Sequence, residues 1–243
     1  VASTNAFNIN AADTDVVTIS GLDILGPTTV PGLSGINFLN GAGVNIRNTT
    51  IKGMATQGVN FTPGAGKTSF LHMENVTITG NGTVGNTATG GINIAPGSNA
   101  TANVVINNVR VQDNANMGLR LDLTGTTGSK INAQATDSLF NSDGIGIFLK
   151  ALTGTGTINA QIDSSTISNN VSYGIAANGS GATGRFSNNT ITGNGSGGAA
   201  TNAGVASLNS ATLSSYGNNR LDGNFNNAGA AANGAFSGTI STH

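Results

Sequence analysis

Two aspartates in neighbouring, similar segments are the candidate metal ligands of this chain. Asp113 and Asp143 lie close to three amide side chains in the repeat described below, Asn114, Asn141 and Asn170. Carboxylate and amide oxygens are the hard ligands that Ca²⁺ prefers, so the pattern predicts a Ca²⁺ site and no other cofactor. The alternative interpretation is that both aspartates are corner residues that replace Asn in the repeat.

A second group could supply acid–base chemistry. Arg120, Asp122 and Lys150 lie on or just after strands of adjacent repeats, so a base and an acid could face one groove. Arg120 and Lys150 are the only candidates for catalytic residues. The alternative is that all three belong to a solvated surface, and on that interpretation the chain has no catalytic residue.

Apolar residues recur with a long period, which sets the positions of these candidates. Successive anchors are 24 to 33 residues apart, with a mean period of roughly 28. In the early repeats, apolar residues precede the anchor by two, five and seven positions, and later repeats keep this pattern more weakly. The step of two is typical of strands, and the step of three absorbs a corner. The anchors are Ile24, Ile51, Ile78, Val111, Phe140, Ile167, Ile191 and Leu221.

Asn residues form two columns in phase with the anchors. Asn tolerates the left-handed conformation of a tight corner, and stacked amides can donate and accept along a column. We expect both columns to be hydrogen-bonded ladders, with the amides of the first column inside. Three residues before the anchors stand Asn48, Asn75, Asn108, Asn188 and Asn218; three residues after them stand Asn81, Asn114, Asn170, Asn194 and Asn224, with Asp143 in the same column.

A second apolar strand follows each anchor and opens with Gly, as at Gly58, Gly91, Gly118 and Gly144. Each repeat therefore holds two strands joined by loops of variable length, which indicates a solenoid. The sequence predicts an all-β right-handed parallel β-helix of about 8–9 rungs. It forms one domain over 1–243, with a partial first rung at 1–15, complete rungs over 16–243, and a weaker core after about residue 185.

The segments 44–53 and 71–81 carry a resemblance to a known fold family. They resemble right-handed parallel β-helix repeat proteins of the pectate-lyase-like superfamily, especially uncharacterised secreted proteins of bacteria. The resemblance covers essentially the whole chain. It implies the fold, whereas the superfamily contains lyases, hydrolases, epimerases, adhesins and tailspikes. Its lyases hold Ca²⁺ with acidic residues and use an Arg or Lys as base, while its hydrolases cluster several Asp residues, a pattern that this chain lacks.

Composition excludes several classes of function. The net charge is −1 and only 8% of residues are charged, so no basic surface for nucleic acid is expected. No apolar run reaches the length of a membrane helix, which excludes membrane insertion. The absence of Cys removes disulfides and thiolate metal sites.

Together these patterns favour a non-enzymatic β-helix scaffold, structural or adhesive, that is secreted by a bacterium and lies outside the cell or on its surface. The predicted partners are a cell-surface polysaccharide or further copies of the chain stacked end to end. The alternative is a polysaccharide-active enzyme, a Ca²⁺-dependent lyase of the pectate lyase type.

Overall fold

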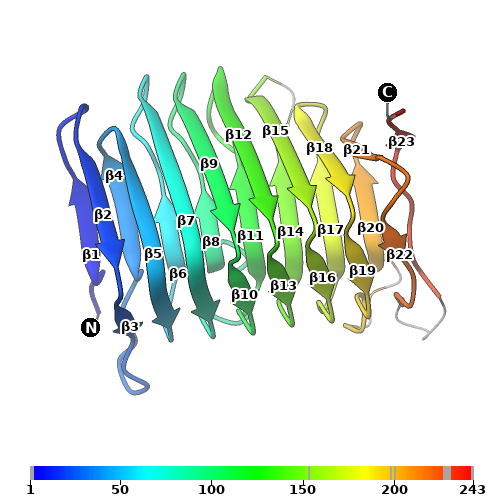
Figure 1. Cartoon of the computed structure of the whole chain (residues 1–243), viewed down its shortest axis with the longest axis horizontal. Coiled ribbons are helices and arrows are strands. Elements are labelled where there is room, and N and C mark those ends of the chain that lie inside the picture. Colours follow the sequence, from blue (N-terminus) through cyan, green and yellow to red (C-terminus); the bar gives the residue numbers. More distant parts are fainter. Residues whose placement is uncertain (1–2, 153, 198, 200, 227–230, 242–243) are drawn as a thin grey trace.

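The computed structural model describes residues 3–152, 154–197, 199, 201–226 and 231–241, and every regular element among them is a strand. Alternating apolar residues allow each strand to bury one face while Gly and Asn turn the corners. The strands pair in parallel with the equivalent strands of neighbouring rungs, and the rungs stack along one axis (Figure 1). The prediction of a parallel β-helix is confirmed.

The first sheet has eight strands, which stack in the order of the chain. They are β1 (Phe7–Asn10), β4 (Ile36–Asn40), β6 (Gln57–Phe61), β8 (Gly90–Ile94), β11 (Met117–Asp122), β14 (Ile145–Lys150), β17 (Tyr173–Asn178) and β20 (Ala203–Leu208).

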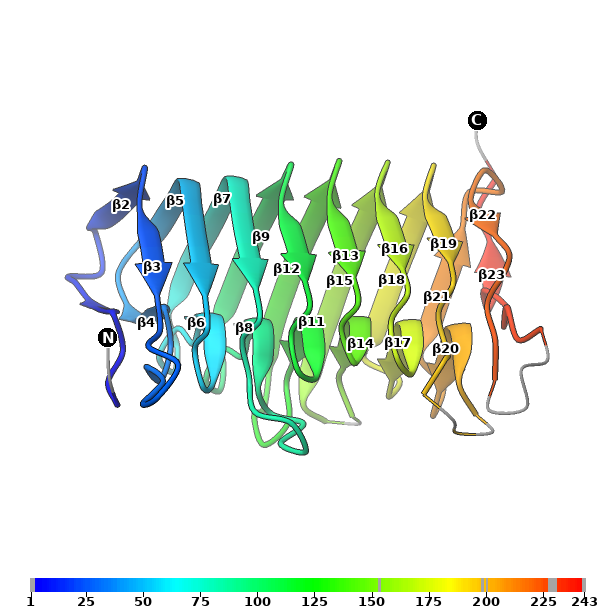
Figure 2. The same ribbon diagram turned by 90° about the horizontal axis from the view of Figure 1, so that it is seen from below.

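The second sheet has fifteen strands and bends along a corner, so that it forms two further faces of the solenoid (Figure 2). One face contains β2 (Val16–Ser20), β9 (Thr101–Asn107), β12 (Ser129–Thr136), β15 (Gly156–Asp163), β18 (Ala182–Ser187), β21 (Thr212–Ser215) and β23 (Gly238–Thr239). The other contains β3 (Asp23–Leu25), β10 (Arg110–Gln112), β13 (Leu139–Asn141), β16 (Thr166–Ser168), β19 (Thr190–Thr192) and β22 (Arg220–Leu221), and the long strands β5 (Gly43–Lys52) and β7 (Thr68–Thr79) span both.

The predicted anchors form one interior column. Seven of the eight are buried, and Leu221 is partly buried against the same core. Strand pairing brings Ile51 beside Ile78, Val111 beside Phe140, and Ile167 beside Ile191. Beyond Ile191 the buried apolar side chains of the described residues are Val205, Ala211 and Leu213.

The first Asn column lies outside the solenoid, so the prediction that its amides lie inside is wrong. Asn48, Asn75 and Asn108 have φ of 47°, 54° and 49° and are exposed. At this corner the residue in the left-handed conformation turns its side chain outward, and the residue that follows it is buried. The exposed amides still form a ladder, because Asn75 donates to Asn48 (3.2 Å) and Asn108 donates to Asn75 (2.7 Å). Asn188 and Asn218 form a similar exposed pair (3.0 Å).

The second Asn column lies inside the solenoid. The prediction that its amides form a hydrogen-bonded ladder is confirmed. Its members are 0–2% exposed, and each side-chain nitrogen donates to the side-chain oxygen of the next rung and to a main-chain carbonyl of a rung before. The members are Asn81, Asn114, Asp143, Asn170, Asn194 and Asn224. Burial with nearly complete hydrogen bonding makes this ladder a rigid seam of the core.

A column of glycines makes room for this interior ladder. A Cβ on Gly174 would lie 2.7 Å from Gly204 O and 2.8 Å from Asn194 Nδ2. In the rung of β14 this position belongs to Gly146 rather than to Gly144, because Leu119 pairs with Ile147. The predicted role of Gly144 is therefore corrected by two residues.

The two ends of the described solenoid differ. At the far end β23 pairs with β21, and the Phe236 ring packs against Phe186 with centroids 5.4 Å apart. At the near end Phe7 and Val16 are exposed beside the first strands. The stacking of copies end to end stays a prediction.

Candidate functional site

The predicted metal ligands Asp113 and Asp143 lie on opposite sides of the solenoid wall. Asp113 has φ of 57° and is exposed at the corner, where Gln112 Nε2 donates to its carboxylate (3.3 Å). Asp143 is fully buried one rung further along, as a member of the interior ladder. One residue of difference in their distance from the anchor places one carboxylate outside and the other inside.

The surroundings of Asp143 suit a neutral acid rather than a metal ligand. Asn114 donates from its main-chain N (2.8 Å) and from Nδ2 (2.9 Å) to Asp143 Oδ1, and the Asp143 main-chain N donates to Asn170 Oδ1 (2.9 Å). Oδ2 is buried and accepts no hydrogen bond within the described part of the chain. Burial is the main cause that raises the pKa of Asp143 to about 7, because desolvation disfavours the charged form.

These two residues do not fit a Ca²⁺ ion, which needs six or more oxygen ligands around one point. Among the described residues, no three His, Cys, Asp or Glu side chains gather closely enough to hold a metal ion. The alternative interpretation holds for both aspartates, because each occupies a corner position that Asn fills elsewhere.

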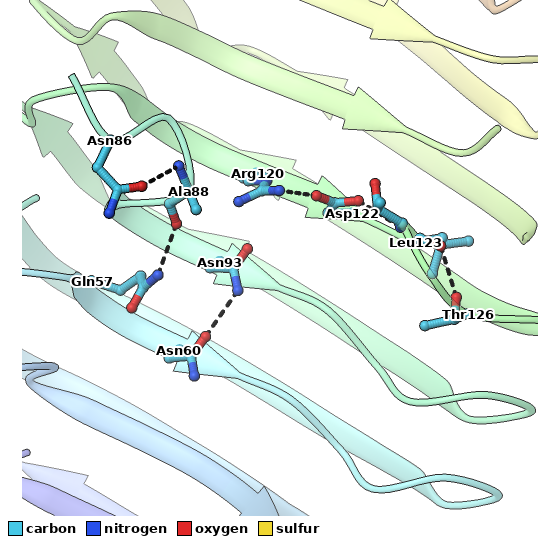
Figure 3. Close-up of polar contacts among 10 residues, drawn as sticks. Gln57, Asn60, Asn86, Ala88, Asn93, Arg120, Asp122, Leu123 and Thr126 are labelled. Atoms are coloured by element: carbon cyan, nitrogen blue, oxygen red, sulfur yellow. Dashed lines mark hydrogen bonds and ion pairs between the residues drawn. The ribbon is translucent and has the colours of Figure 1, made fainter.

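In the second candidate group, Arg120 and Asp122 form an ion pair with each other (Figure 3). Arg120 Nη2 contacts Asp122 Oδ2, and the main-chain N of Thr124 donates to Asp122 Oδ1 (2.7 Å). The side chains of Arg120 and Asp122 are only 18% and 5% exposed. Lys150 lies beside Asp122 in the strand register, but it has no ion pair among the described residues. Both oxygens of the one nearby carboxylate are therefore engaged.

Arg120 also ends a third amide ladder, on the outer face of the first sheet. Asn37 donates to Asn8, Asn60 to Asn37 and Asn93 to Asn60, at 2.8–2.9 Å. Arg120 occupies the next position, because it pairs with Asn93 in the register (Figure 3). Asn93 Oδ1 and Arg120 Nε are buried without a partner in the described residues.

The loop before β8 covers this position. Gln57 Nε2 donates to Ala88 O (2.9 Å), and Asn116 Nδ2 donates to Thr83 O and Asn86 O (2.9 and 2.8 Å), which holds the loop to both neighbouring rungs. The recess between the loop, Asn93 and Arg120 leaves no room for a water molecule. Arg120 is therefore enclosed on the side of this loop, and its side chain is 18% exposed.

A concave surface lies elsewhere, on the face formed by β9, β12, β15 and β18. Two outward columns border a shallow groove of about 360 Å³. The floor is the backbone around Val104, Ala133 and Ala160, whose side chains point inward. We name this groove and its two columns the amide face; the columns are Asn103, Asn132 and Asn159 on one side, and Val105, Gln134, Gln161 and Arg185 on the other.

Most amides of this face have no partner. Asn132 donates to Asn103 (3.0 Å), whereas the side chains of Asn159, Gln134 and Gln161 make no hydrogen bond to the described residues and are exposed. Their hydrogen-bonding groups are free to contact a ligand.

Sequence reasoning missed this face although a signal was present. Asn103, Asn132 and Asn159 stand eight residues before their anchors, and Gln134 and Gln161 stand six before. Apolar residues stand seven and five positions before the anchors and point inward. Residues eight and six positions before the anchors alternate with them and therefore point outward. Aligning these polar positions across rungs, as was done for the apolar ones, predicts the two columns.

The fold and this surface define a parallel β-helix with a polar outer groove that has one charged side chain, Arg185, in its lining. Residues 9–225 match the family model described as a right-handed β-helix region, and the chain belongs to that family. Comparison with curated proteins and with solved structures found no match. No helix among the described residues is long and apolar enough to cross a membrane.

Proposed function

We propose that this protein is a non-enzymatic β-helix scaffold that acts outside a bacterial cell or on its surface, where its amide face adheres to a cell-surface polysaccharide. The observation that supports this most is the burial and pairing of the candidate carboxylates Asp143 and Asp122. Asp143 is enclosed in the interior ladder and both oxygens of Asp122 are engaged, so neither can work on a substrate at the surface.

The amide face carries groups for binding rather than for bond cleavage. A polysaccharide lyase needs a positioned base and a cation or acid that stabilises the developing negative charge. On the amide face the single charged side chain is Arg185, which has no ion pair in the described part of the chain. The closest carboxylate in the strand register, Asp163, accepts hydrogen bonds from Ser187 and Asn188, and the Ser187 bond is the main cause that lowers its pKa.

An activity assay tests the proposal. We expect no cleavage of polygalacturonate or alginate, with or without Ca²⁺, because Asp143 is enclosed in the interior ladder and Asp122 is paired with Arg120. The measurements are the ultraviolet absorbance of unsaturated uronates and the count of new reducing ends. Turnover that Asp122→Ala or Asp113→Ala abolishes would establish the lyase instead. Turnover in the wild type that survives both changes would also contradict a non-enzymatic role.

A further inference from the structure

We propose that the ligand of the amide face is an uncharged polysaccharide that lies along the solenoid axis across β9, β12, β15 and β18. This inference rests on the proposed function and specifies the chemistry of its partner. Figure 1 shows these four strands side by side on one face of the solenoid.

The direction of the groove follows from its lining. Its side chains come from equivalent positions of successive rungs, since Gln134 pairs with Gln161 and Gln161 with Arg185. The groove therefore runs perpendicular to the strands, and its side chains repeat at the strand spacing of about 4.8 Å. This repeat is close to the length of one pyranose unit in an extended glycan, so a linear polymer can present one unit to each rung.

The hydrogen-bonding chemistry matches sugar hydroxyls. A side-chain amide offers two donors and an acceptor with two lone pairs, and a hydroxyl both donates and accepts. Asn159, Gln134 and Gln161 are exposed, lie on both sides of the groove and have no partner among the described residues. They can contact a ligand without breaking an internal hydrogen bond.

The charge of the groove disfavours an acidic polymer. A polyuronate carries a carboxylate on every unit, whereas Arg185 is the one cation among the ten lining residues and lies on the last of the four strands. Carboxylates over β9, β12 and β15 would lose water without gaining a cation from the lining, since Lys130 of β12 lies one outward position beyond Asn132. The exposed apolar side chain of Val105 favours a pyranose ring face over a charged group at the first of these strands.

Affinity electrophoresis of the full chain in gels containing mixed-linkage β-glucan or galactomannan tests the inference, with polygalacturonate and alginate gels in parallel. We expect retardation by at least one neutral polymer and little by the uronates. The double variant Gln134→Ala, Gln161→Ala should bind about tenfold more weakly, because two amides that contact the ligand are lost. Gln112→Ala, a change of the same type on β10, should bind like the wild type.

Salt dependence provides a second readout. Retardation by a neutral polymer should persist at high ionic strength, since no charge pair contributes to it. Retardation by uronates alone, lost with salt or with Arg185→Ala, would overturn the inference, as would the absence of retardation in every gel. Equal binding by the wild type and the double variant would place the ligand elsewhere. Retardation by uronates alone would overturn only the uncharged ligand and leave the proposed adhesion standing, whereas cleavage in the activity assay would overturn the non-enzymatic role.

Discussion

The variant Asp143→Asn should be more stable than the wild type at pH 8, by about 4 kcal/mol. Its side chain completes the interior ladder. Asn114 and Asn170 donate from Nδ2 to the main-chain oxygens of Ile78 and Phe140. An amide at position 143 would have the equivalent oxygen, that of Val111, within reach, whereas a carboxylate offers no donor there.

The pH dependence has a defined sign. The pKa of Asp143 is about 7 in the folded chain against 3.8 for an ordinary Asp, so the folded state holds its proton over a range in which the unfolded state has lost it. The wild type is therefore most stable, with respect to this group, below about pH 4, and it loses stability as the pH rises from about 4 to 7. Three pKa units at about 1.4 kcal/mol each give the estimate of about 4 kcal/mol.

Thermal unfolding of the two proteins from pH 4 to pH 8 measures this effect. The melting temperature of the variant should exceed that of the wild type by about 10 °C at pH 8, and the difference should shrink toward pH 4. The difference between the proteins removes the contributions of Asp163 and the other carboxylates. A variant no more stable than the wild type at pH 8 would show that Asp143 is ionised and accommodated in the folded chain.

The variant Asn170→Ala should have the opposite effect and lose about 3–5 kcal/mol of stability. Asn170 Nδ2 donates to Phe140 O (3.2 Å) and Asn194 Oδ1 (2.8 Å), and its Oδ1 accepts from the main-chain N of Asp143 (2.9 Å). All of these groups are buried, so the substitution leaves several polar atoms without water or a partner. Chemical denaturation followed by circular dichroism measures the loss.

The matched control is Asn75→Gly in the exposed ladder. Glycine keeps the left-handed conformation at φ of 54°, and the two amide contacts that are lost lie in water. We expect a change within about 1 kcal/mol. Equal losses in both variants would contradict the assignment of one Asn column to the interior and the other to the surface.

The sequence by itself determined the architecture. The anchors repeat with a period that only a stacked solenoid accommodates, and seven of them are buried in one column as predicted. It also predicted that the column from Asn81 to Asn224 is an amide ladder, because Asn at the same offset in consecutive rungs points to an amide column, but it did not place this ladder inside. Apolar and amide periodicity is visible in one dimension because every rung repeats the same contacts.

The tertiary structure alone decided whether each polar corner residue lies inside the solenoid or on its surface. At both corners one residue is left-handed and exposed and the next is buried. Asn188 and Asp113 are exposed, whereas Asn189 and Asn114 are buried. Asn and Asp suit either position, so residue type does not distinguish them. Asp113 stands two residues after its anchor and is exposed, whereas Asp143 stands three residues after its anchor and is buried. The two carboxylates therefore do not meet at one Ca²⁺ site.

Access to solvent was likewise decided by packing across rungs. Arg120 and Asp122 have the residue types and spacing of a catalytic pair, but a loop that enters from the preceding rung covers Arg120, and Asp122 is almost fully buried. Gln134 and Gln161, which carry no catalytic signal, are exposed and line the groove of the amide face. Loop length is visible in the sequence, whereas the face that a loop covers depends on where its hydrogen-bond partners lie in the folded chain.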